Sequence, residues 1–452
     1  MALSYGTTPG VSIDVEGGTI AGVELGEEEL LVVFARGDPG SGDAQVNSPT
    51  RVTSTEAAET EFGEGTRLAE ILKDAIYNGA NARAGYVHGV MPATQSVTGE
   101  AIAGGSDSLG NAPIIEDVDE LTVQNTTDGQ EADVEFRYDS PPTAPSDDNT
   151  VHINPFSGEV EAGDADDYEV DYKYLDWESA IQSASTVPSE GESAVFAVDS
   201  VAETVASTLF GEKTTLRDPD YKMVKAFAGG QPNANTSETP PDPMYDTDAY
   251  DDTLDSFAGF VVAPARQDDS TTTLLGAVAG VAAGNPLDDP ILTTNLSDVT
   301  IERGENDEAL LTKAERDALR ESQVMPIRAS GGIEIDGEVS TDTGESWETT
   351  YQAVRTIDRA ILGVRQIGRA FRGQLDVDAP DFDTEEIAAQ EALGFLEDLV
   401  DDRLLQPNTE DEPDRLYVRP AGGGPGTIAL DVGVTPTYAV DTFETTITVN
   451  TA

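Results

Sequence analysis

A change of pattern along the chain is the feature that most constrains its fold. Between about residues 30 and 90 the sequence alternates strand, helix and strand. Leu30–Phe34 is an unbroken apolar run, Thr66–Tyr77 repeats apolar residues at helical spacing, and Ala84–Val87 is a second short strand. Asn78-Gly79 ends the helix. This alternation is typical of helices layered on a sheet.

The following segment, from about Pro92 to Asp176, contains strand and turn signals only. Pro141-Pro142 and Asp147-Asp148-Asn149 mark turns between short runs of alternating apolar and polar residues. The predicted strands are Leu121–Val123, Val134–Tyr138, Val151–Ile153 and Tyr168–Tyr172. We therefore expect a small all-β domain, a sandwich, inserted into an α/β body.

Helical periods return in the second half of the chain. We expect helices at about Trp177–Ser185, Val201–Phe210, Thr273–Gly284, Thr312–Ser322, Glu345–Phe371 and Thr384–Leu405. The longest, near Glu345–Phe371, carries one apolar stripe formed by Val354, Ile357, Ile361, Val364 and Phe371. Further strands are predicted at Phe260–Val262, Leu416–Val418 and Ile428–Val432. The fold class is therefore mixed α/β (α+β) with several domains.

We divide the chain by these changes of pattern. The expected parts are an N-terminal β arm (1–20), the first part of a core α/β domain (21–91), the inserted β-sandwich-like domain (92–176), a middle α/β domain (177–330), a C-terminal core domain with long helices that packs with 21–91 (331–436), and a C-terminal β arm (437–452).

Each end of the chain carries a short alternating strand. At the front, Val11, Ile13 and Val15 share one face of a strand after Pro9-Gly10. At the back the same period relates three apolar residues among threonines: Phe443, Ile447 and Val449. We expect neither strand to have a partner adjacent in sequence. Such a strand either joins a distant sheet of its own chain or adds to a sheet of another molecule, which builds polymers.

The charge of the chain limits its partners. It has 87 Asp and Glu residues against 25 Lys and Arg residues, a formal charge of −62 over 452 residues, and six of the bases are Lys. Nucleic acid and membrane insertion are therefore not expected. Because molar salt shortens the screening length to about 3 Å, we expect a halophilic protein that weakens as salt is removed.

No catalytic, cofactor-binding or metal-binding set is predicted, and we expect no enzyme activity. The two histidines, His88 and His152, are far apart in sequence and have no nucleophile or ligand motif beside them. The chain has no cysteine. Its first residues lack a basic segment followed by an apolar run, so we expect synthesis in the cytoplasm without a signal peptide.

One basic segment stands out in this acidic chain. The long helix carries five arginines, opposed within that stretch by Asp358 alone: Arg355, Arg359, Arg365, Arg369 and Arg372. These arginines either pair with the acid-rich helix that follows or form a positive face that docks onto an acidic partner.

Several short motifs, in order, resemble the contractile tail sheath proteins of myoviruses and related injection machines. The N-terminal ones are Pro9-Gly10-Val11-Ser12-Ile13, Phe62-Gly63 and Asn78-Gly79-Ala80. The later ones are the Ala/Gly-rich helix Leu274–Gly284 ahead of Asn285-Pro286, the capped helix before Val324-Met325-Pro326-Ile327-Arg328, the long helix, the helix with Leu393-Gly394-Phe395-Leu396, and the terminal strand. The resemblance covers about residues 9–90 and 195–452.

The resemblance implies a structural subunit that polymerises around an inner tail tube and contracts to drive the tube through a target envelope. Both arms would add strands to neighbouring subunits, and the five arginines from Arg355 to Arg372 would face the tube. It also implies hexameric rings stacked into a helical sheath, baseplate and tail terminator proteins as partners, and a place in a virion tail assembled in the host cytoplasm. The alternative is a halophile cell-surface or adhesion protein built from β domains.

Overall fold

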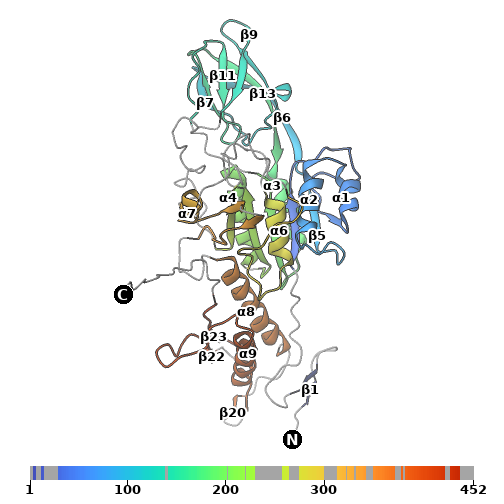
Figure 1. Ribbon diagram of the computed structural model, residues 1–452, viewed down its shortest axis with the longest axis vertical. Helices are drawn as coiled ribbons and strands as arrows, with labels where there is room; N and C mark the ends of the chain where they lie inside the picture. Colours follow the sequence, from blue (N-terminus) through green and yellow to red (C-terminus); the bar gives the residue numbers. More distant parts are fainter. Residues whose placement is uncertain are drawn as a thin grey trace, which may run out of the picture. The chain divides into compact units, whose positions relative to one another are not determined.

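The structure, a computed structural model, divides by its contacts into two compact units (Figure 1). Unit 1 comprises Met1–Glu27, Pro286–Leu292 and Glu345–Ala452, and unit 2 comprises Glu28–Asn285 and Thr293–Gly344. The residues described are 4–6, 12–14, 29–137, 141–200, 202–218, 220–229, 257–263, 274–299, 313–321, 323–329, 332–342, 350–371, 378–379, 382–422 and 428–437. The chain therefore passes between the units four times.

Unit 2 is built on a seven-stranded sheet in the order β17-β16-β15-β14-β3-β5-β4. Every neighbouring pair is parallel except β4 and β5. Its strands are β3 (Leu30–Phe34), β4 (Thr50–Val52), β5 (Val87–Val90), β14 (Ser193–Val198), β15 (Met223–Gly229), β16 (Gly259–Val262) and β17 (Val324–Met325). The central strands are apolar on both faces, as expected for a parallel sheet covered by helices on each side.

Helices cover both faces of this sheet. They are α1 (Thr55–Phe62), α2 (Arg67–Tyr77), α3 (Trp177–Ser183), α4 (Glu203–Arg217), α6 (Leu275–Gly284) and α7 (Lys313–Glu321), with 3₁₀ turns at Val118–Glu120 and Ala184–Thr186. Val32 and Phe34 pack with residues of α3 and α4. The opposite face of β5 meets α1 and α2, because a Cβ on Gly89 would touch the rings and methyls of Phe62 and Leu72.

Helices α2 and α6 approach each other backbone to backbone. Gly276, Gly280 and Gly284 lie four residues apart on one side of α6. A Cβ on Gly280 would overlap the carbonyl oxygen of Ala75, and one on Gly284 would overlap that of Gly79. The contact therefore depends on the absence of side chains at these positions.

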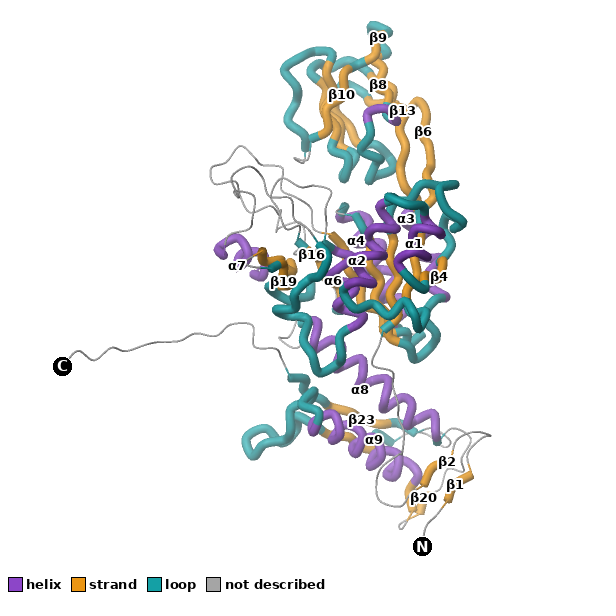
Figure 2. The backbone as a smooth tube through the Cα atoms, turned by 45° about the vertical axis from the view of Figure 1, so that its right-hand side comes forward, coloured by secondary structure: helices purple, strands orange, loops and turns teal. Residues whose placement is uncertain are grey.

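The inserted domain consists of two four-stranded sheets, β6-β13-β8-β9 and β10-β11-β12-β7. Their inner faces share one apolar cluster that includes Val123, Ile153 and Tyr168. The strands are β6 (Ala93–Ile102), β7 (Ser106–Ser108), β8 (Thr122–Asn125), β9 (Gln130–Glu131), β10 (Asp133–Phe136), β11 (Thr150–Ile153), β12 (Glu159–Ala162) and β13 (Tyr168–Asp176). β6 and β13 join this domain to the seven-stranded sheet (Figure 2). The predicted mixed fold with an inserted all-β domain is confirmed.

Unit 1 centres on two long helices, α8 (Tyr351–Ala370) and α9 (Thr384–Asp401). They come close at Gly363, where a Cβ would overlap the ring of Phe395. The hairpin of β22 (Tyr417–Pro420) and β23 (Leu430–Gly433) packs on them through Val418 and Leu430. The remaining strands of unit 1 form two short pairs: β1 (Ser4–Gly6) with β2 (Ser12–Asp14), and β20 (Asp378–Ala379) with β21 (Phe382–Asp383).

The structure corrects the expected division of the chain in two places. Segments 28–91 and 193–344 share the seven-stranded sheet, although we predicted 21–91 and 177–330 as separate domains. The second boundary falls after Gly344 and not at 330. The reason is that β14 lies directly beside β3 in the sheet, so strands distant in sequence complete one layer.

Candidate assembly surfaces

The N-terminal strand has a partner within its own chain. β2 pairs antiparallel with β1, and Ile13 lies opposite Tyr5. Our expectation that this strand has no sequence-adjacent partner is therefore wrong, and Pro9-Gly10 between the two strands was the turn signal that could have shown it. Val11 and Val15 lie outside the described residues. An isolated two-stranded hairpin is marginally stable in water, so this pair would gain stability by joining a larger sheet.

The last described residues, 435–437, are fixed by hydrogen bonds to the segment that follows α9. The amide of Gln406 donates to the carbonyl of Thr435 (2.8 Å), and the amide of Thr437 donates to that of Leu404 (2.9 Å). The Thr437 hydroxyl also donates to the carbonyl of Arg403 (2.7 Å). The predicted arm residues Phe443, Ile447 and Val449 lie outside the described residues. Residues 435–437 are thus the anchored point, called the anchored root below, from which the predicted arm would start.

Arg355 does not fit its predicted role on a docking surface. The side chain is 1% exposed, and its guanidinium donates to the carbonyl of Pro286 (3.1 Å) and lies over the ring of Tyr351 (5.6 Å). Gln352 makes a parallel contact with the carbonyl of Leu287 (2.6 Å). The first turn of α8 is buried all round, so Arg355 holds the segment Pro286–Leu292 within unit 1.

The other arginines of α8 differ in exposure. Arg359 and Arg365 are half-buried and Arg369 is exposed, whereas Arg372 lies outside the described residues. Each of the first three already interacts with another group of the chain. Helix α9 carries both buried carboxylates, such as that of Glu391, and exposed ones, such as that of Glu397. A tube-facing role stays a prediction, and Arg369 is its most accessible described residue.

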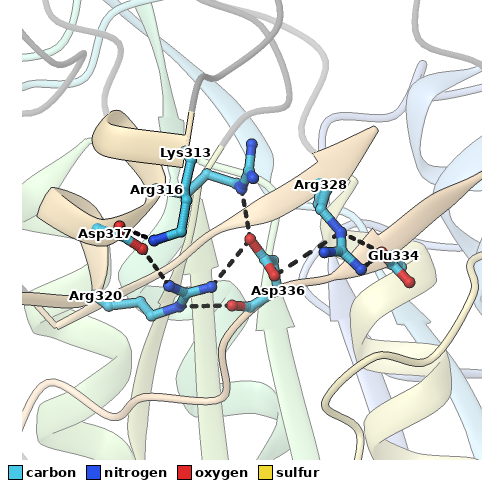
Figure 3. Close-up of polar contacts among 7 residues, drawn as sticks. All are labelled: Lys313, Arg316, Asp317, Arg320, Arg328, Glu334 and Asp336. Carbon is cyan, nitrogen blue, oxygen red and sulfur yellow. Dashed lines mark hydrogen bonds and ion pairs between the residues drawn. The ribbon is translucent and has the colours of Figure 1, made fainter. Parts of the chain in front are cut away.

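A second basic group, which sequence reasoning did not single out, joins α7 to the hairpin of β18 (Ile327–Ala329) and β19 (Ile333–Ile335) (Figure 3). Its centre is Asp336, which is 9% exposed. The carboxylate of Asp336 lies 2.5 Å from Nε of Arg316, 3.0 Å from Nη2 of Arg320 and 4.0 Å from Nε of Arg328. Arg328 also pairs with Glu334.

The outer part of this group is a pair of contacts along α7. Asp317 lies 2.5 Å from Lys313 and 2.7 Å from Arg320. Nε of Arg320 donates in addition to the backbone carbonyl of Asp336 (2.7 Å). These ion pairs link the helix to the hairpin, so we interpret the group as a structural joint. The spacing of its acids and bases in sequence gave no local signal of it.

No group of three or more His, Cys, Asp or Glu side chains in the described part of the chain is arranged to hold a metal ion. His152 is buried, with Nδ1 2.5 Å from the carbonyl of Thr143 and Nε2 3.4 Å from Glu135. Among the described helices, none has both the length and the hydropathy that a membrane crossing requires.

Comparison with known proteins finds the same architecture in other chains. No protein-family profile matches the sequence, and no curated protein matches it significantly. Solved structures, however, match it over nearly the whole length of both chains. A chain in the baseplate of the anti-feeding prophage is 13% identical, with a TM-score of 0.55, and the match covers 99% of this chain and 100% of that one.

Two contracted sheaths give the same result. The sheath complex of the extracellular contractile injection system PVC is 12% identical, with a TM-score of 0.54 and coverage of 99% and 98%. The helical sheath of the anti-feeding prophage is 14% identical, with a TM-score of 0.51 and coverage of 98% and 99%. The chain has the fold of a contractile sheath subunit. The resemblance inferred from short motifs is thus confirmed at the level of the fold.

Proposed function

We propose that this chain is the structural subunit of a contractile tail sheath, which polymerises around an inner tail tube and shortens to drive the tube through a target envelope. The main observation in support is the shared sheath fold, which extends over 98–99% of the chain in the three matches. Because one fold can serve several functions, the proposal also depends on the two arms. An adhesion protein made of β domains would lack the seven-stranded α/β body.

The arms supply the joints of the polymer in this proposal. The β1–β2 pair has outer edges that no other described strand covers, and the C-terminal arm leaves from the anchored root at 435–437. Four or five backbone hydrogen bonds at about 1 kcal/mol each give about 4–5 kcal/mol per arm. Repetition along a helical tube makes such joints sufficient, and they stay connected while the subunit bodies rotate.

The proposal implies further partners. Copies of the chain form hexameric rings stacked into a helical sheath, with an inner tail tube protein inside and baseplate and tail terminator proteins at the ends. Arg369, with Arg359 and Arg365, is the described part of the face toward the tube. The subunit is not an enzyme, and it works in a virion tail after assembly in the host cytoplasm.

The test is polymerisation of the purified chain in molar salt, observed by negative-stain electron microscopy. We expect helical tubes from the wild-type chain and folded monomers from a variant lacking residues 441–452. Sheets, or monomers alone, from the wild-type chain would contradict a sheath.

The matched control replaces residues 441–452 by a Gly/Ser segment of equal length. It keeps the chain length but removes the alternating apolar residues Phe443, Ile447 and Val449. We expect it to remain monomeric like the deletion. Tubes of normal length from either variant, with unchanged thermal unfolding, would refute strand addition by this arm.

A further inference from the structure

One long strand in unit 2 has an outer edge with no described strand beside it; the amide of Ala93, at its start, donates to the side chain of Asn47 (3.0 Å). β6 lies at the margin of its sheet and pairs with β13 alone among the described strands (Figure 2). Its first five residues, Ala93–Val97, contain neither a charge nor a proline, and Thr94, Gln95 and Ser96 are exposed. A bulge at Gly99 (φ +67°), whose amide donates to Asp171 (2.6 Å), ends the regular part of the strand.

The hydrogen-bonding direction of β6 follows from its partner strand. The carbonyl of Lys173 accepts from the amide of Ile115 (2.8 Å), which lies on the side of β13 away from β6. Ser96 lies opposite Lys173 and Thr94 lies opposite Leu175. Since antiparallel pairs alternate between bonded and non-bonded, the amides and carbonyls of Thr94 and Ser96 point outward. Those of Gln95 and Val97 bond to β13.

The other edge strands of the large sheets in unit 2 carry devices that prevent strand addition. β4 has three residues including Arg51, and β17 has two residues followed by Pro326. In the inserted domain β9 has two residues, β7 has three including Asp107, and β10 carries Asp133 and Glu135. Shortness, charge and proline are the usual protections of exposed edges. β6 has the longest edge, and although Pro92 directly precedes it, Ala93–Val97 themselves contain no charge and no proline.

We propose that the outer edge of β6 at Thr94 and Ser96 is an assembly surface that accepts an extended strand from a second copy of the chain. The proposal rests on the proposed function, which brings many copies together. Charge favours this place for contact between copies: most of the surface of a chain of −62 repels another copy, whereas the edge at Ala93–Val97 carries no charge. The bonds are made by backbone groups, so acidic side chains of the added strand stay in solvent.

Hydrogen exchange read residue by residue tests the edge directly. The wild-type chain is compared as purified monomer and after assembly in molar salt. In the monomer the amides of Thr94 and Ser96 exchange quickly, and in the assembly we expect them to slow by at least about 100-fold. The amides of Gln95 and Val97 are slow in both states and serve as internal controls. Fast exchange at Thr94 and Ser96 in the assembly overturns the proposal.

A pair of substitutions at one position separates backbone from side chain. Ser96→Pro removes the outward amide without breaking a bond to β13, whereas Ser96→Ala keeps that amide. We expect Ser96→Pro to raise the concentration needed for self-association about tenfold, as for the loss of one hydrogen bond per copy, and Ser96→Ala to leave it unchanged. Equal behaviour of the two variants, with wild-type unfolding curves, contradicts the proposal.

Sedimentation together with electron microscopy distinguishes this proposal from the sheath proposal. If the wild-type chain self-associates with protection at Thr94 and Ser96 but forms no tubes, the β6 edge is supported and the sheath is not. Tubes without that protection would support the sheath and contradict the proposal for the β6 edge. A chain that never self-associates contradicts both.

Discussion

Two helices of unit 2 are held in opposite ways. Helix α6 meets α2 through Gly276, Gly280 and Gly284, and nine of its ten residues are buried and uncharged. Helix α7 is joined to the β18–β19 hairpin by three arginines around Asp336. The first contact depends on shape and the second on charge. We therefore expect salt to leave the first joint unchanged and to weaken the second only slightly, since largely buried ion pairs are screened less than exposed ones.

Gly280→Ala is the strongest test of the shape-dependent joint. The added methyl would overlap the carbonyl oxygen of Ala75, so the helices must separate. We expect the free energy of unfolding to fall by about 3 kcal/mol, as for a severe overpacking. Urea unfolding followed by circular dichroism measures it.

The control is the same substitution at an open helical position. Gly211 in α4 has no atom near the place of a Cβ, so Gly211→Ala should stabilise the chain by up to about 1 kcal/mol. If both alanine variants change stability by the same amount, helix propensity and not close packing governs the α2–α6 contact.

Asp336→Asn tests the charged joint. The substitution leaves the guanidinium groups of Arg316 and Arg320, both largely buried, without their shared carboxylate. We expect a loss of about 2 kcal/mol in the free energy of unfolding, less than for a fully buried ion pair. Asp317→Asn is the matched control, because the Asp317 side chain is 39% exposed and solvent screens its ion pairs, so its substitution should cost much less than that of Asp336. Equal losses would mean that Asp336 is not the centre of the group.

A carboxyl group beside the uncharged joint should give a pH signature. On α2, burial raises the pKa of Asp74 to about 6, aided by Glu70 and Asp298 and opposed by Arg67 and Lys73. The folded state binds this proton more tightly than the unfolded state. Its contribution is therefore complete below about pH 4 and is lost as the pH rises through about 6.

Asp74→Asn should remove that loss and stabilise the chain at pH 7–8. Two pKa units correspond to about 3 kcal/mol, and solvent screening of the half-buried group reduces the expected gain to about 1 kcal/mol. Unfolding curves of the two chains at pH 4 and pH 8 measure it. A variant with the same pH dependence as the wild type would show that another group titrates.

Salt gives the smallest effect and the most direct contrast. The wild-type melting temperature should rise between about 0.1 M and molar salt, because the repulsion of the −62 charge is screened. The penalty of Asp336→Asn should shrink by about 0.5 kcal/mol over the same range, while that of Gly280→Ala stays constant. A wild-type melt unchanged by salt would contradict the halophilic interpretation of the composition.

Local periodicity predicted those elements that carry their own signal. β3 is an unbroken apolar run and α2 has its stripe and its cap at Thr66, so both were found. β14 and β15 were missed. In β15 the run is interrupted by Lys225, whose ammonium is fully buried and bonds to Glu29 (2.8 Å) and Ser193 (2.6 Å). Ser193 lies on β14 and Glu29 directly precedes β3, and no local pattern shows that the Glu29 carboxylate neutralises the lysine.

For the candidate surfaces, as for the helices and strands, the sequence predicted only what has a signal of its own along the chain. The motif order indicated the sheath fold, since order along the chain survives where identity is only 12–14%. The role of Arg355 was not predictable, because the carbonyl that it binds belongs to Pro286, 69 residues earlier. The open edge of β6 was hidden for the same reason. An edge exists only once the order of the strands in the sheet is known.

The hydrogen bonds from Arg355 to Pro286 and from Gln352 to Leu287 have a consequence for biosynthesis. The ribosome makes segment 286–292 well before α8, so this part of unit 1 is at first without the residues that bind it. The seven-stranded sheet of unit 2 can form earlier, once β17 has emerged. Unit 1 closes only when its final hairpin is translated. A nascent subunit therefore cannot mature its second folding unit early, and premature termination before β23 leaves the newly made α8 with an incomplete core.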